Sequence, residues 1–258
     1  MERWQDQGIV LSIRPHGENG AVVSLLTQAQ GRHAGYVRGA HSSKLRGTLE
    51  AGNLVDANWQ ARVEGDLGSL TLELVRSPAA HIMQDSLKLA ALQSACALCD
   101  SALPEREGHP GLFHGLNALF EALQSDVWGA AYVMWEVAFL RELGFSLDFS
   151  KCAGGGDVRD LMYVSPKTGR AVSRAAGEIY KERLLPLPGF LKPRTLSLQG
   201  EGENEDILTG LNLTGYFLEH WAYAHHSQGI PEPRLRFAAR FAKYVEDSSE
   251  GRLRHHVA

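Results

Sequence analysis

The sequence predicts an α+β protein in which a five-stranded β-barrel precedes a mainly α-helical domain. Short β-rich runs separated by glycine-containing turns fill residues 8–76. After Pro78 the apolar residues recur every three to four positions, which is the helical period. The charge balance changes at the same place, because residues 1–78 carry 8 Lys or Arg and 8 Asp or Glu, whereas residues 79–150 carry 3 and 9. We therefore place a domain boundary near residue 78, between domains 1–78 and 79–258.

The five predicted strands have the number and length found in small Greek-key barrels. They are the runs GIVLSIR, AVVSLLTQ, RHAGYVRG, NLVDANWQARV and LGSLTLELV, with alternating apolar side chains at Leu70, Leu72 and Leu74. Five short strands in about 70 residues suit an OB-fold. An SH3-like barrel would give a similar pattern, and the strand count does not separate the two.

The second domain is predicted to contain five helices and one irregular insertion. Helical periodicity covers residues 81–103, 112–124, 127–145, 205–227 and 232–247. Residues 148–172 are glycine-rich and break that periodicity, and a polar run at 199–206 reads as a linker.

Composition indicates a protein of the reducing cytoplasm. The 258 residues are 44% hydrophobic, enough for two buried cores, and no run approaches the roughly 18 to 20 apolar residues that cross a bilayer. The opening MERWQDQGIV lacks the order of a signal peptide. Three cysteines are too few to staple a secreted fold. We expect a cytoplasmic location.

Motif searches favour a binding protein over an enzyme. We find no serine elbow, Walker or kinase signature, or carboxylate pair at metal-binding spacing, and expect no catalytic residues. Gly154, Gly155 and Gly156 lack the Lys-Ser/Thr pair of a phosphate loop. Cys96 and Cys99 form a C-x2-C, but their small-residue helical setting favours core packing over metal or redox chemistry. The histidines of residues 220–226 and 255–256 have no common ligand geometry.

A basic cluster in the barrel is the candidate binding site. It comprises Arg14, Arg32, Arg38, Lys44 and Arg46, with Tyr36, His33 and His41 nearby. Cations that hold phosphates and rings that stack under bases are what single-stranded nucleic acid requires. The run RGAHSSKLRG is glycine-flanked and nearly free of large apolar residues, so we expect an exposed, mobile loop. An ordinary solvated loop explains the charges equally well on this evidence alone.

A second basic group lies on the last predicted helix, at Arg234, Arg236, Arg240 and Lys243. Leu235, Phe237, Phe241 and Tyr244 give the same helix an apolar side that we expect to dock on its domain. The cations are then left to face water, DNA or an acidic partner.

Three motifs in order resemble the bacterial recombination mediator family RecO along nearly the whole chain. They are W-x3-GIVL at Trp4, GRHAGYVRGA from Gly31, and LRELGFSLDFSKCAGGGDVRDLMYVSPKTGRAVSRAAGEIY from Leu140. The resemblance implies an N-terminal OB-fold, a helical domain, and binding and annealing of single-stranded DNA. It also implies partnership with RecR and the SSB C-terminal tail while a recombinase is loaded onto SSB-coated strands. With this resemblance, DNA contact by the barrel cluster becomes the favoured interpretation.

One departure from the resemblance concerns a metal module. Many members of that family carry four zinc-binding cysteines in the middle segment, at about 148–180 here. Cys152 matches the first ligand, but its partner position is Gly155 and the second pair falls on Ser173 and Ala176. Glycine and alanine offer no zinc donor, so we expect a degenerate module without zinc and no cofactor.

The function that the sequence favours is a DNA repair and recombination mediator that binds single strands. Two other functions stay open: an adaptor whose barrel binds a polypeptide rather than DNA, and a metal-dependent nuclease whose signature is not recognisable. Gel shifts with oligonucleotide competitors would separate the first from DNA binding, and EDTA-sensitive cleavage would reveal the second.

Overall fold

The computed structural model describes residues 1–63, 65–193 and 204–255, and its contacts divide the chain into two compact units. Unit 1 holds residues 1–124 with 231–234, and unit 2 holds residues 125–230 with 235–258. The predicted linker at 199–206 falls largely on residues 194–203, and His256 also lies outside the described residues. Among the residues described, no helix is both long and apolar enough to span a membrane.

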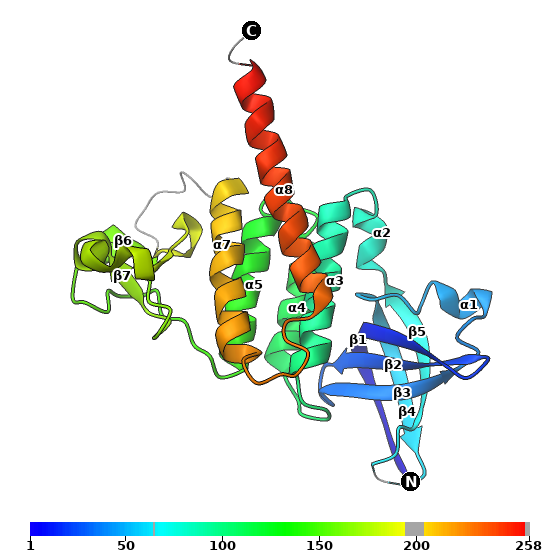
Figure 1. The fold of residues 1–258 in the computed structure, drawn as a ribbon. Coiled ribbons are helices and arrows are strands. Elements are labelled where there is room, and N and C mark those ends of the chain that lie inside the picture. The colour runs from blue at the N-terminus through cyan, green and yellow to red at the C-terminus, as the bar shows by residue number, and fades with distance from the viewer. Residues whose placement is uncertain (64, 194–203, 256–258) are drawn as a thin grey trace. The chain divides into compact units, whose positions relative to one another are not determined.

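Unit 1 begins with the predicted five strands, closed into a barrel in the order β1-β2-β3-β5-β4 (Figure 1). The strands are β1 (Glu2–His16), β2 (Gly20–Thr27), β3 (Arg32–Arg38), β4 (Leu54–Ala61) and β5 (Ser69–Arg76). Antiparallel pairing joins β1 to both β2 and β4, whereas β3 meets β5 in parallel at Tyr36 and Ser69. This arrangement fits the OB-type description, so the predicted fold class is confirmed.

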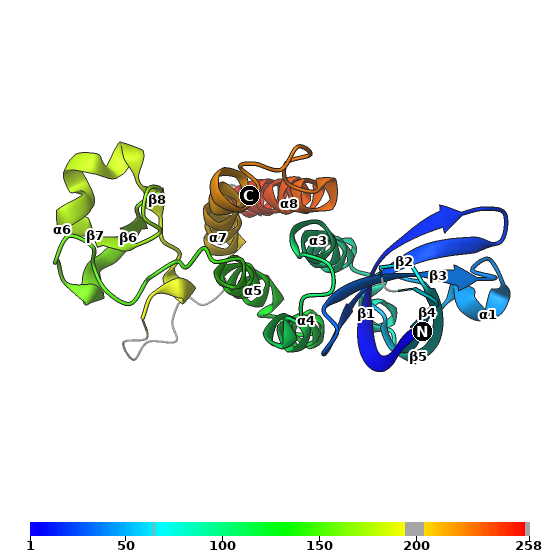
Figure 2. The same ribbon diagram turned by 90° about the horizontal axis from the view of Figure 1, so that it is seen from below.

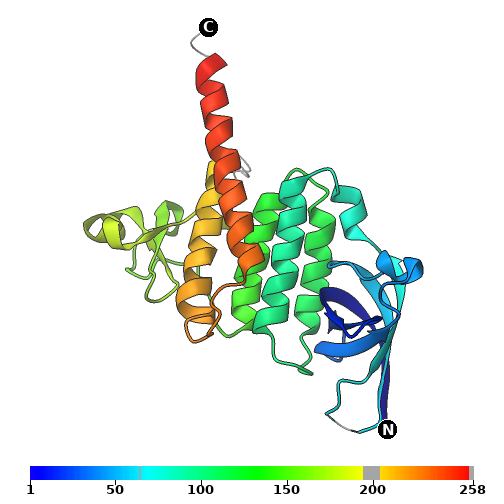
Figure 3. The same ribbon diagram turned by 45° about the vertical axis from the view of Figure 1, so that its right-hand side comes forward.

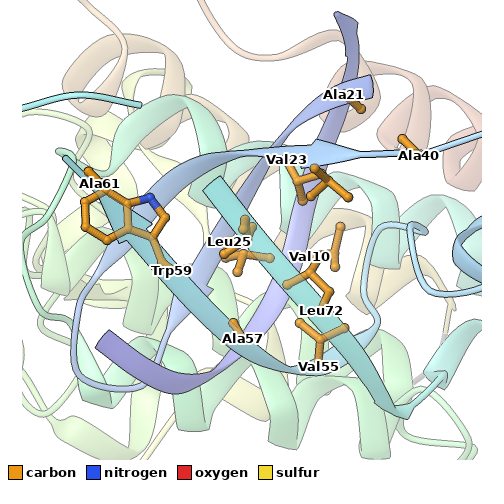
Figure 4. Close-up of a cluster of buried hydrophobic side chains, with 12 residues drawn as sticks. Val10, Ala21, Val23, Leu25, Ala40, Val55, Ala57, Trp59, Ala61 and Leu72 are labelled. Carbon is orange, nitrogen blue, oxygen red and sulfur yellow. The ribbon is translucent and has the colours of Figure 1, made fainter. Parts of the chain in front are cut away.

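Alternate side chains of the barrel strands fill its interior. Figure 4 shows this core, in which Val10, Val23, Leu25, Val55, Trp59 and Leu72 are all at most 5% exposed. The predicted apolar face of β5 ends early, because Leu70 and Leu72 are buried but Leu74 is 46% exposed. Beyond Leu72 the strand has left the core, and the pairing of β4 with β5 shifts register at Leu54 and Val55.

Three helices follow the barrel strands in unit 1: α2 (Pro78–Ile82), α3 (Ser86–Ala102) and α4 (Pro110–Ala122). Asp85 caps α3 by accepting hydrogen bonds from the backbone N–H groups of Leu87 and Lys88. Figure 2 shows α3 and α4 beside the barrel, where α3 packs against β1 and β2. These helices therefore belong to the same compact unit as the barrel, although the change from strand to helix occurs near residue 78.

Unit 2 is built around α5 (Trp128–Glu142) and α7 (Asn204–Phe217), which lie side by side in Figures 1 and 3. The Thr214 hydroxyl donates a 2.5 Å hydrogen bond to the fully buried Glu136. A π-helical turn, η4 (Leu218–Ala222), follows α7, so the helix predicted to run to residue 227 ends sooner. Phe237 and Phe241 of α8 (Glu232–His255) pack on Trp128, with ring centroids 6.3 and 5.8 Å away.

The insertion of unit 2 is more regular than the sequence predicts. It contains a three-stranded sheet in the order β7-β6-β8, formed by β6 (Leu161–Val164), β7 (Ala171–Ser173) and β8 (Leu185–Pro186). Short helices precede, separate and follow these strands along the chain: η1 (Val158–Asp160), α6 (Arg174–Gly177), η2 (Glu178–Arg183) and η3 (Gly189–Leu191). Strands of two to four residues are too short to give a recognisable alternation, which is why the sequence suggests irregular structure.

Candidate nucleic-acid interface

Strand register places two rows of side chains on the outer face of β1, β2 and β3. In the first row Arg14 lies opposite Val22, which lies opposite Tyr36, and in the second His16, Gly20 and Arg38 are aligned in the same way. Successive side chains on a strand alternate between faces, so residues two apart share a face. Arg14, His16 and Arg38 are exposed, while Val23 and Val37 point into the barrel core. The two rows therefore form one basic, ring-bearing surface, which we call the barrel face.

Tyr36 lies in the middle of the barrel face, where its ring covers Gly20. A Cβ atom at residue 20 would collide with the hydroxyl and ring of Tyr36, so only glycine allows the ring to lie across that strand. The His16 ring contacts Tyr36 edge to face at 5.9 Å. Tyr36 is partly exposed, so a base could stack on its ring.

The basic segment after β3, which we expected to be an exposed, mobile loop, contains one helical turn. This turn is α1 (Ser43–Arg46), preceded by Gly39 at φ +70° and followed by Gly47. The partly buried Leu45 packs against the barrel core. His41 and Arg46 are exposed as expected. Lys44 lies on α1, and its side chain is outside what the structure describes.

Arg32 and His33 do not join the barrel face. Arg32 donates a 2.7 Å hydrogen bond to the Leu103 carbonyl and pairs with Asp100 and Glu105 at 3.7 and 3.4 Å, so it fastens α3 and the loop after it to the barrel. His33 is 4% exposed and packs edge-on against Trp59 at 4.6 Å. The side chains of both residues are therefore engaged in contacts within unit 1.

The environment of His33 keeps its ring neutral. Burial lowers the pKa of His33 to about 4, and the nearby positive charge of Arg106 acts in the same direction. Neither ring nitrogen has a hydrogen-bond partner among the described residues. A neutral, buried ring cannot contact phosphate, so His33 contributes to the core.

The cations of α8 separate into one buried and three exposed side chains. Arg234 is 2% exposed, contrary to our expectation that all four would face solvent, whereas Arg236, Arg240 and Lys243 are exposed. Only part of the predicted apolar side is buried, because Leu235 and Tyr244 are 53% and 44% exposed. Phe237, Phe241 and Val245 form the buried stripe, which leaves the three exposed cations along another side of the helix.

Comparison with known proteins gives the relationships of the chain. Family models described as the N-terminal and C-terminal parts of recombination protein O match residues 1–78 and 83–226. The chain belongs to the recombination protein O (RecO) family. It is 52% identical over 242 residues to DNA repair protein RecO of Rhodospirillum centenum, covering 93% of this chain and 95% of that protein. The Caulobacter vibrioides NA1000 protein of the same name is 47% identical over 241 residues, with 93% and 98% covered.

The RecO resemblance drew attention to four positions of a possible zinc module, and the structure brings them into two adjoining turns. A Cβ atom on Gly154 would meet the Ala176 side chain at 2.9 Å, and one on Gly156 would collide with the Ser173 hydroxyl. Cys152 lies between these turns and is 7% exposed. No group of three metal-binding side chains occurs in the described part of the chain. The turns are thus arranged around one thiol instead of four.

Hydrogen bonds make Cys152 different from the other two cysteines. The Cys152 sulfur accepts a hydrogen bond from the Ser173 backbone N–H at 3.2 Å, and the Cys152 thiol donates one to the Ser173 hydroxyl oxygen at 3.4 Å. Burial acts to raise the pKa of Cys152, but these bonds and those from the Gly156 and Gly154 backbones outweigh it, so the pKa is lowered. In α3, by contrast, burial raises the pKa of Cys96 to about 12 and that of Cys99 well above its ordinary value.

Proposed function

We propose that this RecO family chain is a DNA repair and recombination mediator that binds and anneals single-stranded DNA. The observation that carries the proposal is the barrel face, where strand register aligns Arg14 and Arg38 around the ring of Tyr36. Cations can hold phosphates while the ring stacks under a base, and neither contact reads sequence. The relatives' printed name, DNA repair protein RecO, supports the same role.

The proposal assigns the DNA face to the barrel, residues 1–78, and partner binding to residues 79–258. Arg46 on α1 extends the cationic surface, and we propose that Lys44 of the same helix also contacts DNA, while Arg32 is excluded by its ion pairs. We further propose that Arg236, Arg240 and Lys243 meet the acidic SSB C-terminal tail or a second stretch of DNA. RecR and a recombinase acting downstream complete the proposed set of partners.

Substituting Tyr36 tests the barrel face directly. In anisotropy titrations with a labelled oligo-dT strand, Tyr36→Ala should weaken binding about fivefold or more, because each stacked base contributes about 1–3 kcal/mol. The salt dependence should stay unchanged, since no charge is lost. Tyr36→Phe is the matched control, because it keeps the ring and removes the hydroxyl. Equal affinity of all three proteins would remove Tyr36 from the interface.

The partner surface is tested with the whole chain and a peptide that has the acidic SSB tail. The Arg236→Glu/Arg240→Glu/Lys243→Glu variant should lose peptide binding, whereas Arg14→Glu/Arg38→Glu should retain it. If the barrel variant loses peptide binding and the α8 variant keeps it, the tail binds the barrel and our assignment of the tail site to α8 is wrong.

One observation favours the alternative of a polypeptide-binding barrel. A cavity of about 840 Å³ lies where β3 and β5 diverge, and its lining includes Leu45, Leu70, Leu72 and Leu74. Apolar walls beside a strand edge suit an extended peptide segment. A competition experiment decides between the two functions. If the barrel binds DNA, unlabelled single strands of any sequence should displace labelled oligo-dT from the protein.

A further inference from the structure

The insertion of unit 2 is basic although the chain as a whole is acidic. Residues 148–193 contain 8 Lys or Arg and 5 Asp or Glu, a net charge of +3, against −4 for the chain. Three of the five acids already pair locally, namely Asp157 with Arg159, Asp160 with Arg174, and Glu178 with Lys181. The exposed cations without an ion pair to any described residue include Lys167 and Arg183. The insertion therefore presents a positive surface.

The short helix η2 of this insertion carries protruding apolar side chains, and its own charges balance, with Glu178 and Glu182 against Lys181 and Arg183. Ile179 is 87% exposed, as much as Met1, and Tyr180 is 57% exposed. A 3-10 helix has three residues per turn, so Tyr180 and Arg183 share one edge of η2. A ring and a guanidinium thus face solvent together, next to an isoleucine that no packing explains.

The helix η2 is anchored at both ends. Gly177, just before η2, is buried, and a Cβ atom there would meet the Tyr163 ring at 2.6 Å. Ser173 caps the preceding α6 by accepting a hydrogen bond from the Ala176 N–H, and the Leu184 N–H closes η2 on the Lys181 carbonyl. Ile179 and Tyr180 therefore protrude from a frame that is fixed by packing and hydrogen bonds.

We propose that η2 is a second nucleic-acid contact, at which Ile179 and Tyr180 stack on the terminal base pair of a duplex end or junction. Arg183 and the neighbouring cations would contact the phosphates, and the net positive charge of the insertion matches a polyanion. Aliphatic side chains act on DNA as wedges at base steps, and tyrosine stacks on bases. This inference rests on the proposed function, and it identifies where the duplex product of annealing would be held.

Other occupants suit η2 less well. Protruding side chains provide no concave wall to enclose a peptide, and an acidic peptide would leave Ile179 in water. A six-residue helix also has far less apolar area than the amphipathic helices that lie in membranes. The bare end of a duplex, by contrast, is a flat apolar surface bordered by phosphates, which fits a ring, an isoleucine and a cation.

The test uses the full chain and a blunt duplex carrying 2-aminopurine at its terminal pair, because stacking changes the fluorescence of that base. Protein should change the signal of the terminal probe and leave an internal probe unchanged. Ile179→Ser/Tyr180→Ser should weaken the end contact about fivefold or more. Arg183→Glu should flatten the salt slope of duplex-end binding by about 0.9. Val158→Ser is the matched control, since it removes an exposed apolar side chain of the same insertion.

Parallel titrations with oligo-dT distinguish this inference from the proposed function. If the wild-type chain does not bind oligo-dT, the proposed function fails; if it binds oligo-dT and the η2 variant retains the duplex-end signal, only this inference is overturned. The η2 variant should show unchanged circular dichroism and melting, because both substituted side chains are exposed. Binding of the wild type to phosphatidylserine vesicles that is lost in the η2 variant, with no change at the duplex end, would overturn the proposal in favour of a membrane contact.

Discussion

Reversing the two arginines of the barrel face should change the salt dependence of DNA binding in a defined way. Arg14 and Arg38 are exposed on adjacent rows of the same face, and neither forms an ion pair with the described residues. Each phosphate contact gives a slope of about −0.7 in log affinity against log salt for single strands. Arg14→Glu/Arg38→Glu should therefore flatten the slope by about 1.4. Over a roughly fourfold rise in salt, the advantage of the wild type shrinks about sevenfold.

The control for this experiment has the same charge change elsewhere on the barrel. Arg3 and Arg62 are exposed, on β1 and just after β4. Arg3→Glu/Arg62→Glu should leave the slope much closer to that of the wild type. Stability should change by no more than about 0.5 kcal/mol per substitution in either variant, which thermal melting checks. Equal flattening in both variants would show that net charge, and not the barrel face, governs binding, and an unchanged slope in a folded Arg14→Glu/Arg38→Glu protein would refute the assignment.

Three further predictions concern residues inside the units. Arg32→Ala should lower the free energy of unfolding by about 1–3 kcal/mol, because a hydrogen bond to Leu103 and two ion pairs are lost. The salt slope of DNA binding should stay unchanged. A variant of unchanged stability with a flatter slope would show that Arg32 belongs to the DNA interface. The pKa of His33 is lowered to about 4 in the folded chain, so its contribution to the free energy of unfolding is present above pH 6.5 and is lost as the pH falls toward 4. This contribution amounts to about 3 kcal/mol. His33→Phe should make the free energy of unfolding less sensitive to pH in that range, which denaturant titrations would measure. Cys152 should react with iodoacetamide before Cys96 and Cys99, and at a lower pH than an ordinary thiol, because its pKa is lowered and theirs are raised; mass spectrometry that finds Cys96 modified first would contradict this.

The sequence could identify the candidate residues but not their surroundings. Arg14 and Arg32 look alike in sequence, since both are basic residues in predicted strands. Asp100 and Glu105 follow Arg32 by about 70 positions, and only the fold brings these acids to it. Gly20 and His16 were missed as contributors to the barrel face, although the turn signal at Gly17 and Gly20 could have placed both beside the β1–β2 hairpin.

What the sequence determined by itself is set by local physical chemistry. Alternation of apolar residues defines the five strands, three-to-four spacing defines the helices, and the loss of three expected cysteines can be read directly from the letters. Tertiary structure decided which cations remain exposed, because burial and ion pairing depend on residues distant in the chain. It buried Arg234 and exposed Arg236 two positions later, it made His33 neutral between Trp4 and Trp59, and it lowered the pKa of Cys152 with backbone N–H groups that no sequence pattern reveals. The sequence shows which residues are charged, but the tertiary structure decides which of those charges are exposed and free to bind a partner.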